Sequence, residues 1–151
     1  MALNKFKGVL VLTLLSVTLV WCTFNNVRIN MAEDNNDGKA FLNVYYSKIK
    51  AKDYKGVDNM LSDSLKRLAG NNGFSKLLKF INSKVSTYNS YKIEDYYVKR
   101  ITGSMNEISY NYKLKVTYQK GTTEEIIGFK RLNGGVIKVN SYHAYSDLLI
   151  H

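Results

Sequence analysis

Cysteine and histidine are almost absent from this sequence, and their scarcity excludes several kinds of chemistry. Cys22 is the only cysteine among 151 residues. The chain after it therefore has no disulfide framework, no cysteine nucleophile and no cysteine-based zinc site. The two histidines, His143 and His151, are too few for a histidine-based metal site. We predict that the protein holds no metal.

Motifs for cofactor chemistry are also missing. The sequence contains no phosphate-binding glycine loop, no nucleophile elbow and no dinucleotide fingerprint. The acids that occur in pairs, such as Glu124 and Glu125, are adjacent in sequence, so in a strand their carboxylates point to opposite faces. We predict that the protein uses no cofactor.

Charge is absent from a long run near the N-terminus. Residues 8–24 carry no charged side chain, and Lys5 and Lys7 precede them. A basic segment followed by a short apolar run is typical of export signals. We predict that residues 1–22 form a lipoprotein-type signal or a membrane anchor.

Three interpretations of this leader stay open. It resembles a bacterial lipoprotein signal, in which Cys22 would receive the lipid; Leu19 and Val20 fit that pattern, whereas Trp21 is bulkier than the small residue expected before the cysteine. In the second interpretation the run is kept as an anchor with its basic end in the cytoplasm. In the third it is cleaved and the domain is released. The first two predict a membrane-anchored domain in the cell envelope, facing the periplasm or the exterior.

The segment after the leader has a different composition. Residues 23–38 are rich in asparagine and acids, which cannot bury enough apolar surface to offset the entropy of ordering. We predict a flexible tether over residues 23–38, followed by one folded domain over residues 39–151.

The first half of this domain has helical spacing. Apolar residues three and four positions apart predict a helix with Asp37 as its N-cap, a kinked or broken helix after Asp53, and a third helix over residues 74–88. A loop at Gly70 to Gly73 separates the last two.

The second half changes to a period of two. Apolar and polar residues alternate over 108–119, which predicts a long strand with one buried face. Residues 91–102, 126–132 and 136–145 complete a predicted four-stranded antiparallel meander. Because one apolar face of such a sheet must be covered, we expect the helices to pack on it, which makes the fold class α+β.

The order of these segments resembles a known kind of domain. Four segments carry the resemblance. They are the acid-aromatic pair Asp53–Tyr54, the strand over 110–118, the strand that begins at Glu124, and the glycine turn and final strand over 134–139. They are similar to the nuclear-transport-factor-2-like and cystatin-like domains of small bacterial lipoproteins. The resemblance implies N-terminal helices packed on a curved four-stranded sheet, a cone whose mouth holds a ligand in many relatives.

If the cone of this chain holds a ligand, its pocket must be formed by side chains on the inner sheet face. Tyr110 and Tyr112 lie on the apolar face of the long strand, and His143 shares the predicted strand face of Ile137 and Val139. Asp95 is the one acid expected to face inward. We assign no catalytic residue, because tyrosine is common in strands and a histidine near a strand end is usually a partly exposed residue without a task. A cone filled by Phe41, Tyr45, Ile81 and Phe129 would instead be a plain core.

The charge of the chain is strongly basic. It carries 22 basic and 12 acidic residues, and from Lys39 onward there are 19 basic and 9 acidic residues. A basic surface on a tethered domain favours anionic lipid or an acidic envelope polymer as a partner. Nucleic acid is disfavoured, because the leader predicts export and because arginine is scarce. An envelope protein, or a second copy bound through the open sheet face, is a further candidate partner.

These observations predict a membrane-tethered, exported binding or interaction module of the cell envelope that is not catalytic. One alternative is an anchored subunit of a secretion-type envelope complex. The other is a small-molecule-binding or isomerase-like domain, with Tyr112 and His143 in its cavity.

Overall fold

The computed structural model describes residues 25–150 of the chain. The elements, in chain order, are β1 (Asn26–Ile29), α2 (Ala32–Lys50), α3 (Tyr54–Asp58), α4 (Asp63–Ala69), α5 (Gly73–Val85), β2 (Tyr88–Thr102), β3 (Glu107–Tyr118), β4 (Gly121–Leu132), β5 (Lys138–Tyr145) and the short 3₁₀ helix η1 (Asp147–Leu149). The predicted signal or anchor over residues 1–22, including Cys22, lies outside the described residues.

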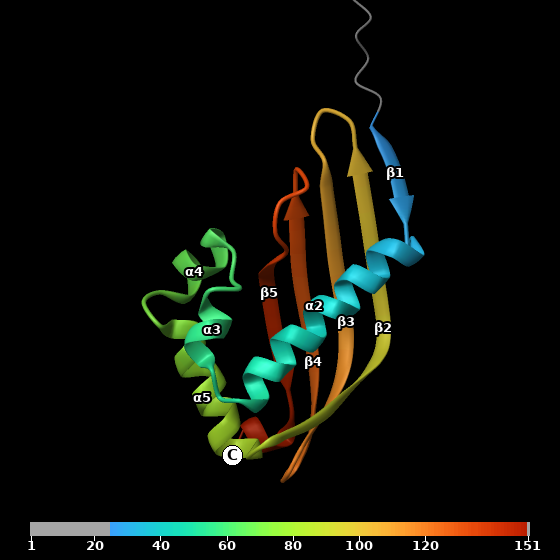
Figure 1. Cartoon of the computed structure of the whole chain (residues 1–151). Coiled ribbons are helices and arrows are strands. Elements are labelled where there is room, and N and C mark those ends of the chain that lie inside the picture. Colours follow the sequence, from blue (N-terminus) through green and yellow to red (C-terminus); the bar gives the residue numbers. More distant parts are fainter. Residues whose placement is uncertain (1–24, 151) are drawn as a thin grey trace, which may run out of the picture.

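The strands form one open antiparallel sheet with the order β1-β2-β3-β4-β5. Helix α2 crosses one face of this sheet, while α3, α4 and α5 gather beside the β5 edge (Figure 1). The predicted α+β class, with N-terminal helices packed on an antiparallel sheet, is confirmed. The predicted number of strands is wrong, because β1 adds a fifth strand next to β2.

The predicted flexible tether over residues 23–38 is also wrong from Asn26 onward. β1 pairs with β2, and α2 begins at Ala32, so the helix starts before its predicted N-cap Asp37. The polar side chains of this segment are the ones that attach it to the sheet. Asn30 exchanges two hydrogen bonds of 2.8 Å with the backbone of Val98. The composition argument failed because these groups find polar partners in the fold, which offset the cost of ordering.

Two buried polar residues hold the first turns of α2 on the sheet. Asp34 is 1% exposed and forms an ion pair with Arg100 of β2, through both the Nε and the Nη2 atoms of the guanidinium group. Asn35 accepts a 2.8 Å hydrogen bond from the Tyr112 hydroxyl. The helix therefore begins where it does because a charge and an amide both have partners across the sheet.

The rest of α2 supplies the apolar side of the interface. Leu42, Tyr45 and Tyr46 are at most 2% exposed and lie against the inner face of the sheet. Gly38 permits this close packing, because a Cβ atom at that position would clash with the Tyr112 hydroxyl. The alternation predicted for β3 is confirmed, since its burial follows a period of two along the whole strand.

None of the helices between residues 25 and 150 combines the length and the apolar character that a membrane span requires.

Candidate functional site

Two of the three predicted pocket residues lie in the packed core. Tyr110 and Tyr112 are 1% and 0% exposed on the inner face of β3. Their rings stack on Phe129 of β4, with centroids 4.9 and 5.5 Å away. Burial raises the pKa of Tyr110 to about 12, and it also raises the pKa of Tyr112. Both hydroxyls therefore stay protonated at neutral pH, and both rings are part of the buried core.

The third predicted pocket residue, His143, lies on the other face of the sheet. Two consecutive residues of β4 pair with Ser141 and Val139, which leaves Asn140 as an extra residue, a β-bulge. This bulge reverses the alternation, so Tyr142 turns inward and His143 is exposed. The structure therefore separates His143 from Tyr110 and Tyr112, and the face predicted for His143 is corrected.

Other large side chains occupy the inner face around the two tyrosines. Tyr45, Ile81 and Phe129 are at most 3% exposed, and the partly buried ring of Phe41 lies 4.7 Å from that of Phe129. These four residues are the ones expected to fill the interior if it were a plain core. Around Phe129, the inner face of the sheet is packed with aromatic and aliphatic side chains.

The most unusual buried group is the carboxylate of Glu125, which the sequence prediction missed. Glu125 is 1% exposed and accepts four hydrogen bonds from hydroxyl groups. Its Oε1 atom accepts from Tyr118 at 2.7 Å and from Thr123 at 2.8 Å. Its Oε2 atom accepts from Tyr46 and Tyr142, both at 2.8 Å. Helix α2 and strands β3, β4 and β5 all contribute a donor.

The surroundings of the tyrosines in this cluster keep their hydroxyl groups protonated. Burial, and after it the nearby charge of Glu125, raises the pKa of Tyr46, Tyr118 and Tyr142 well above the ordinary value for tyrosine. These tyrosines therefore remain donors. A carboxylate has about four acceptor positions, so four hydroxyl donors leave none for a substrate proton. The arrangement is that of a structural polar core and not of a general base.

A signal for this cluster was present in the sequence. Ile127 and Phe129 are inward residues of β4, and the period of two also places Glu125 inward. We predicted Asp95 as the inward acid, and that prediction is wrong. A register shift at Glu94 turns Asp95 outward, where it is exposed. A bulge therefore explains why the sheet face was predicted wrongly for both His143 and Asp95.

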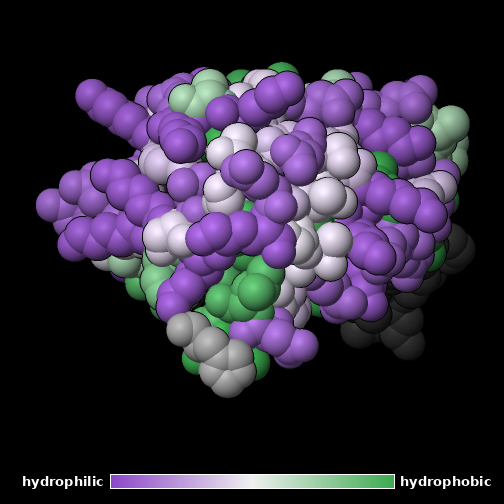
Figure 2. All heavy atoms as spheres, turned by 90° about the horizontal axis from the view of Figure 1, so that it is seen from below, coloured by the Kyte–Doolittle hydropathy of each residue, from purple (hydrophilic) through white to green (hydrophobic). Residues whose placement is uncertain are grey.

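The outer sheet face carries lysines, as the alternation predicts, together with the exposed rings of Tyr97 and Tyr145. Lys115 is exposed there, and Lys113 forms a 2.9 Å ion pair with Glu124 of the neighbouring strand. The end of the molecule that carries η1 is also mostly hydrophilic, with a small hydrophobic area (Figure 2). Two exposed apolar residues of that end are Leu148 and Ile150.

A concave surface lies between the three short helical segments. This α3–α5 cleft has a volume of about 420 Å³, and its walls combine buried apolar residues, amides and charged groups. The lining residues are Asp58, Asn59, Leu61, Lys66, Arg67, Ala69, Gly70, Asn71, Asn72 and Phe74. Its size falls within the usual range for ligand clefts.

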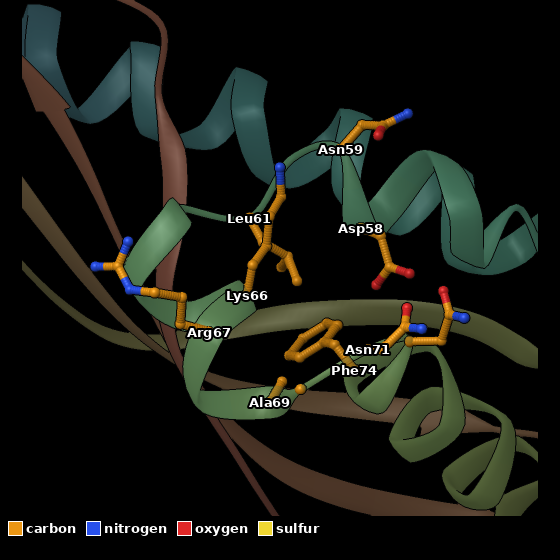
Figure 3. Close-up of a pocket in the computed structure, with 10 residues that line it drawn as sticks. Asp58, Asn59, Leu61, Lys66, Arg67, Ala69, Asn71 and Phe74 are labelled. Carbon is orange, nitrogen blue, oxygen red and sulfur yellow. The ribbon is translucent and has the colours of Figure 1, made fainter.

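Polar groups converge inside this cleft. Figure 3 shows the carboxylate of Asp58 directed toward Asn71, which lies beside the ring of Phe74, while Arg67 extends away from them. The Oδ2 atom of Asp58 accepts a hydrogen bond from Ser75, but its buried Oδ1 atom has no hydrogen-bond partner among residues 25–150. A buried acceptor without a donor is costly, so this atom is an unusual feature of the cleft wall. The cleft could not be predicted from the sequence, because its shape depends on how α3, α4, α5 and their connections pack against one another.

No group of three or more His, Cys, Asp or Glu side chains is arranged to hold a metal ion in the described part of the chain. The comparisons with known proteins identify no family: no family model matches the chain, and no curated protein matches it.

Proposed function

We propose that this protein is a non-catalytic interaction module that is exported to the cell envelope and held at a membrane by its N-terminus. The proposal rests on the uncharged run that ends near Cys22 and on the packed core of the described domain. The observation that supports its non-catalytic part is the saturated carboxylate of Glu125, because this glutamate, the only one buried among residues 25–150, has no acceptor position left for a substrate.

The finer fold proposal is a cone of the nuclear-transport-factor-2-like or cystatin-like kind. Its support is the path of α2 across the inner face of the sheet and the unbroken antiparallel order of the strands (Figure 1). If side chains fill the interior of such a domain, a partner binds at its outer surface instead. The α3–α5 cleft is then the recognition surface, and its partner is an envelope protein that contacts the amides and charged groups of its walls.

The membrane part of this proposal is tested by lipid labelling. In cells given radiolabelled palmitate, we expect the label to enter the protein and to be lost in Cys22→Ser, because the thiol is the attachment atom. Mass spectrometry should find a mature protein that begins at Cys22. An intact Met1 without lipid would reject lipidation and leave the uncleaved anchor, whereas a mature chain that is free of the membrane would reject the tether.

The recognition part is tested by photo-crosslinking in cells. A photoreactive amino acid at Asn71, in the cleft, is expected to give a crosslinked product with an envelope protein. The matched control is Asn111, which is exposed on the outer sheet face. A product at Asn71 and none at Asn111 supports the cleft. A product of twice the chain mass at Asn111, with none at Asn71, would contradict the cleft and favour a homodimer through the sheet.

A further inference from the structure

One end of the sheet brings together the entry of the chain and two turns. The β2–β3 turn over residues 103–106 and the β4–β5 turn over residues 133–137 lie at the end where β1 begins (Figure 1). Asn25 packs so closely on Gly103 that a Cβ atom on this glycine would clash with it. The two turns also contact each other, because Asn133 N donates a 2.7 Å hydrogen bond to Asn106 O. The three segments therefore form one continuous surface.

Large apolar side chains are exposed on this surface. Met105 in the first turn is 54% exposed, Leu132 at the end of β4, where the second turn starts, is 51% exposed, and Val136 within that turn is 73% exposed. Turns of this kind are normally built from small polar residues. We call Met105, Leu132 and Val136 the tip surface. Exposed apolar groups that gather on one end mark a site of contact with a membrane or a protein.

The short connection to Cys22 favours a membrane over a protein as the partner of the tip surface. Because β1 begins at Asn26, only three residues separate it from Cys22. The four Cα–Cα steps from Cys22 to Asn26 span at most about 14 Å when the chain is fully extended. A lipid on Cys22 would therefore hold the end with the tip surface at the bilayer, whereas the predicted 16-residue tether over 23–38 would have let it move away.

We propose that the tip surface inserts into the membrane, so that Met105, Leu132 and Val136 are buried at the boundary between headgroups and acyl chains. This inference rests on the proposed membrane tether. It assigns the domain a fixed orientation, with η1 at the far end of the sheet from the bilayer (Figure 1). Helices α3, α4 and α5, whose residues line the α3–α5 cleft, then lie beside the β5 edge and not at the end with the tip surface (Figure 1).

The test uses the full chain in vesicles of phosphatidylethanolamine and phosphatidylglycerol, with Met105→Cys or Val136→Cys labelled by the dye NBD. A nitroxide on the lipid is expected to reduce the emission of both labels roughly twofold, because groups inserted at the interface lie about 5–10 Å deep. The control is Ile150→Cys, which is 77% exposed at the far end and should keep its emission. The wild-type chain, carried through the same labelling, reports any dye on Cys22.

A second variant separates insertion from mere proximity to the membrane. Met105→Asp is expected to abolish the quenching of the label at position 136, whereas Leu148→Asp, at the far end, should leave it unchanged. Flotation of the same vesicles tests the tether. Protein that fails to float overturns the tether and with it the insertion. Protein that floats, but whose labels at 105 and 136 are quenched no more than the label at 150, overturns the insertion alone.

Discussion

Replacing Glu125 by alanine is expected to lower the free energy of unfolding by about 4 kcal/mol, because the change leaves three buried hydroxyl groups and the partly buried Tyr142 hydroxyl without their acceptor. Each unpaired hydroxyl loses a hydrogen bond to a charged group, and the loss of the carboxylate also leaves a cavity. Urea unfolding followed by circular dichroism measures the change.

The adjacent residue provides a matched control. Glu124 is one position away on the same strand, but its side chain is 44% exposed and pairs with Lys113. Exposed ion pairs contribute little, so Glu124→Ala should cost at most about 1 kcal/mol. Equal costs for the two variants would show that the hydroxyl cluster does not stabilise the fold.

The second large effect is expected at the start of α2. Asp34→Asn should lower the free energy of unfolding by about 3 kcal/mol, because it removes the charge that pairs with Arg100 while the side chain stays 1% exposed. The Arg100 guanidinium is then left partly buried, with only the exposed Glu33 at 2.9 Å as an acidic partner. Urea unfolding again measures the change, and hydrogen exchange of β1 and the first turn of α2 should become faster in this variant.

Asp37→Asn is the control for this prediction. Asp37 is on the same helix and forms a 2.8 Å ion pair with Arg131, but it is 47% exposed. Its replacement should cost at most about 1 kcal/mol, because solvent screens the pair. A loss in Asp34→Asn no larger than in Asp37→Asn would contradict the anchoring of α2 by a buried charge.

The alternation of apolar residues was enough to predict β3 and the class of the fold. Along residues 108–118 each inward residue was predicted correctly, because the strand has no bulge and the period of two holds throughout. The inward position of Tyr110 and Tyr112 follows from the same rule. What the rule does not say is whether inward residues line a pocket or fill a core, because that depends on how closely α2 approaches.

Bulges explain the wrong faces. One extra residue at Asn140 moved His143 to the outside, and the shift at Glu94 did the same to Asp95. A bulge is set by the local twist and pairing of two strands, so the sequence of one strand alone carries little sign of it. For the same reason, Tyr142 could not be recognised as a donor to Glu125.

The sequence by itself determined the uncharged run over residues 8–24 with the single cysteine, the absence of cysteine chemistry after it, and the order of helices before strands. These depend on composition and local periodicity. Only the tertiary structure decided that the supposed tether is part of the fold, that Glu125 is surrounded by hydroxyls, and that two turns meet beside the entry of the chain. Each of these joins residues far apart in sequence, and such pairings become visible only once the backbone has brought them together.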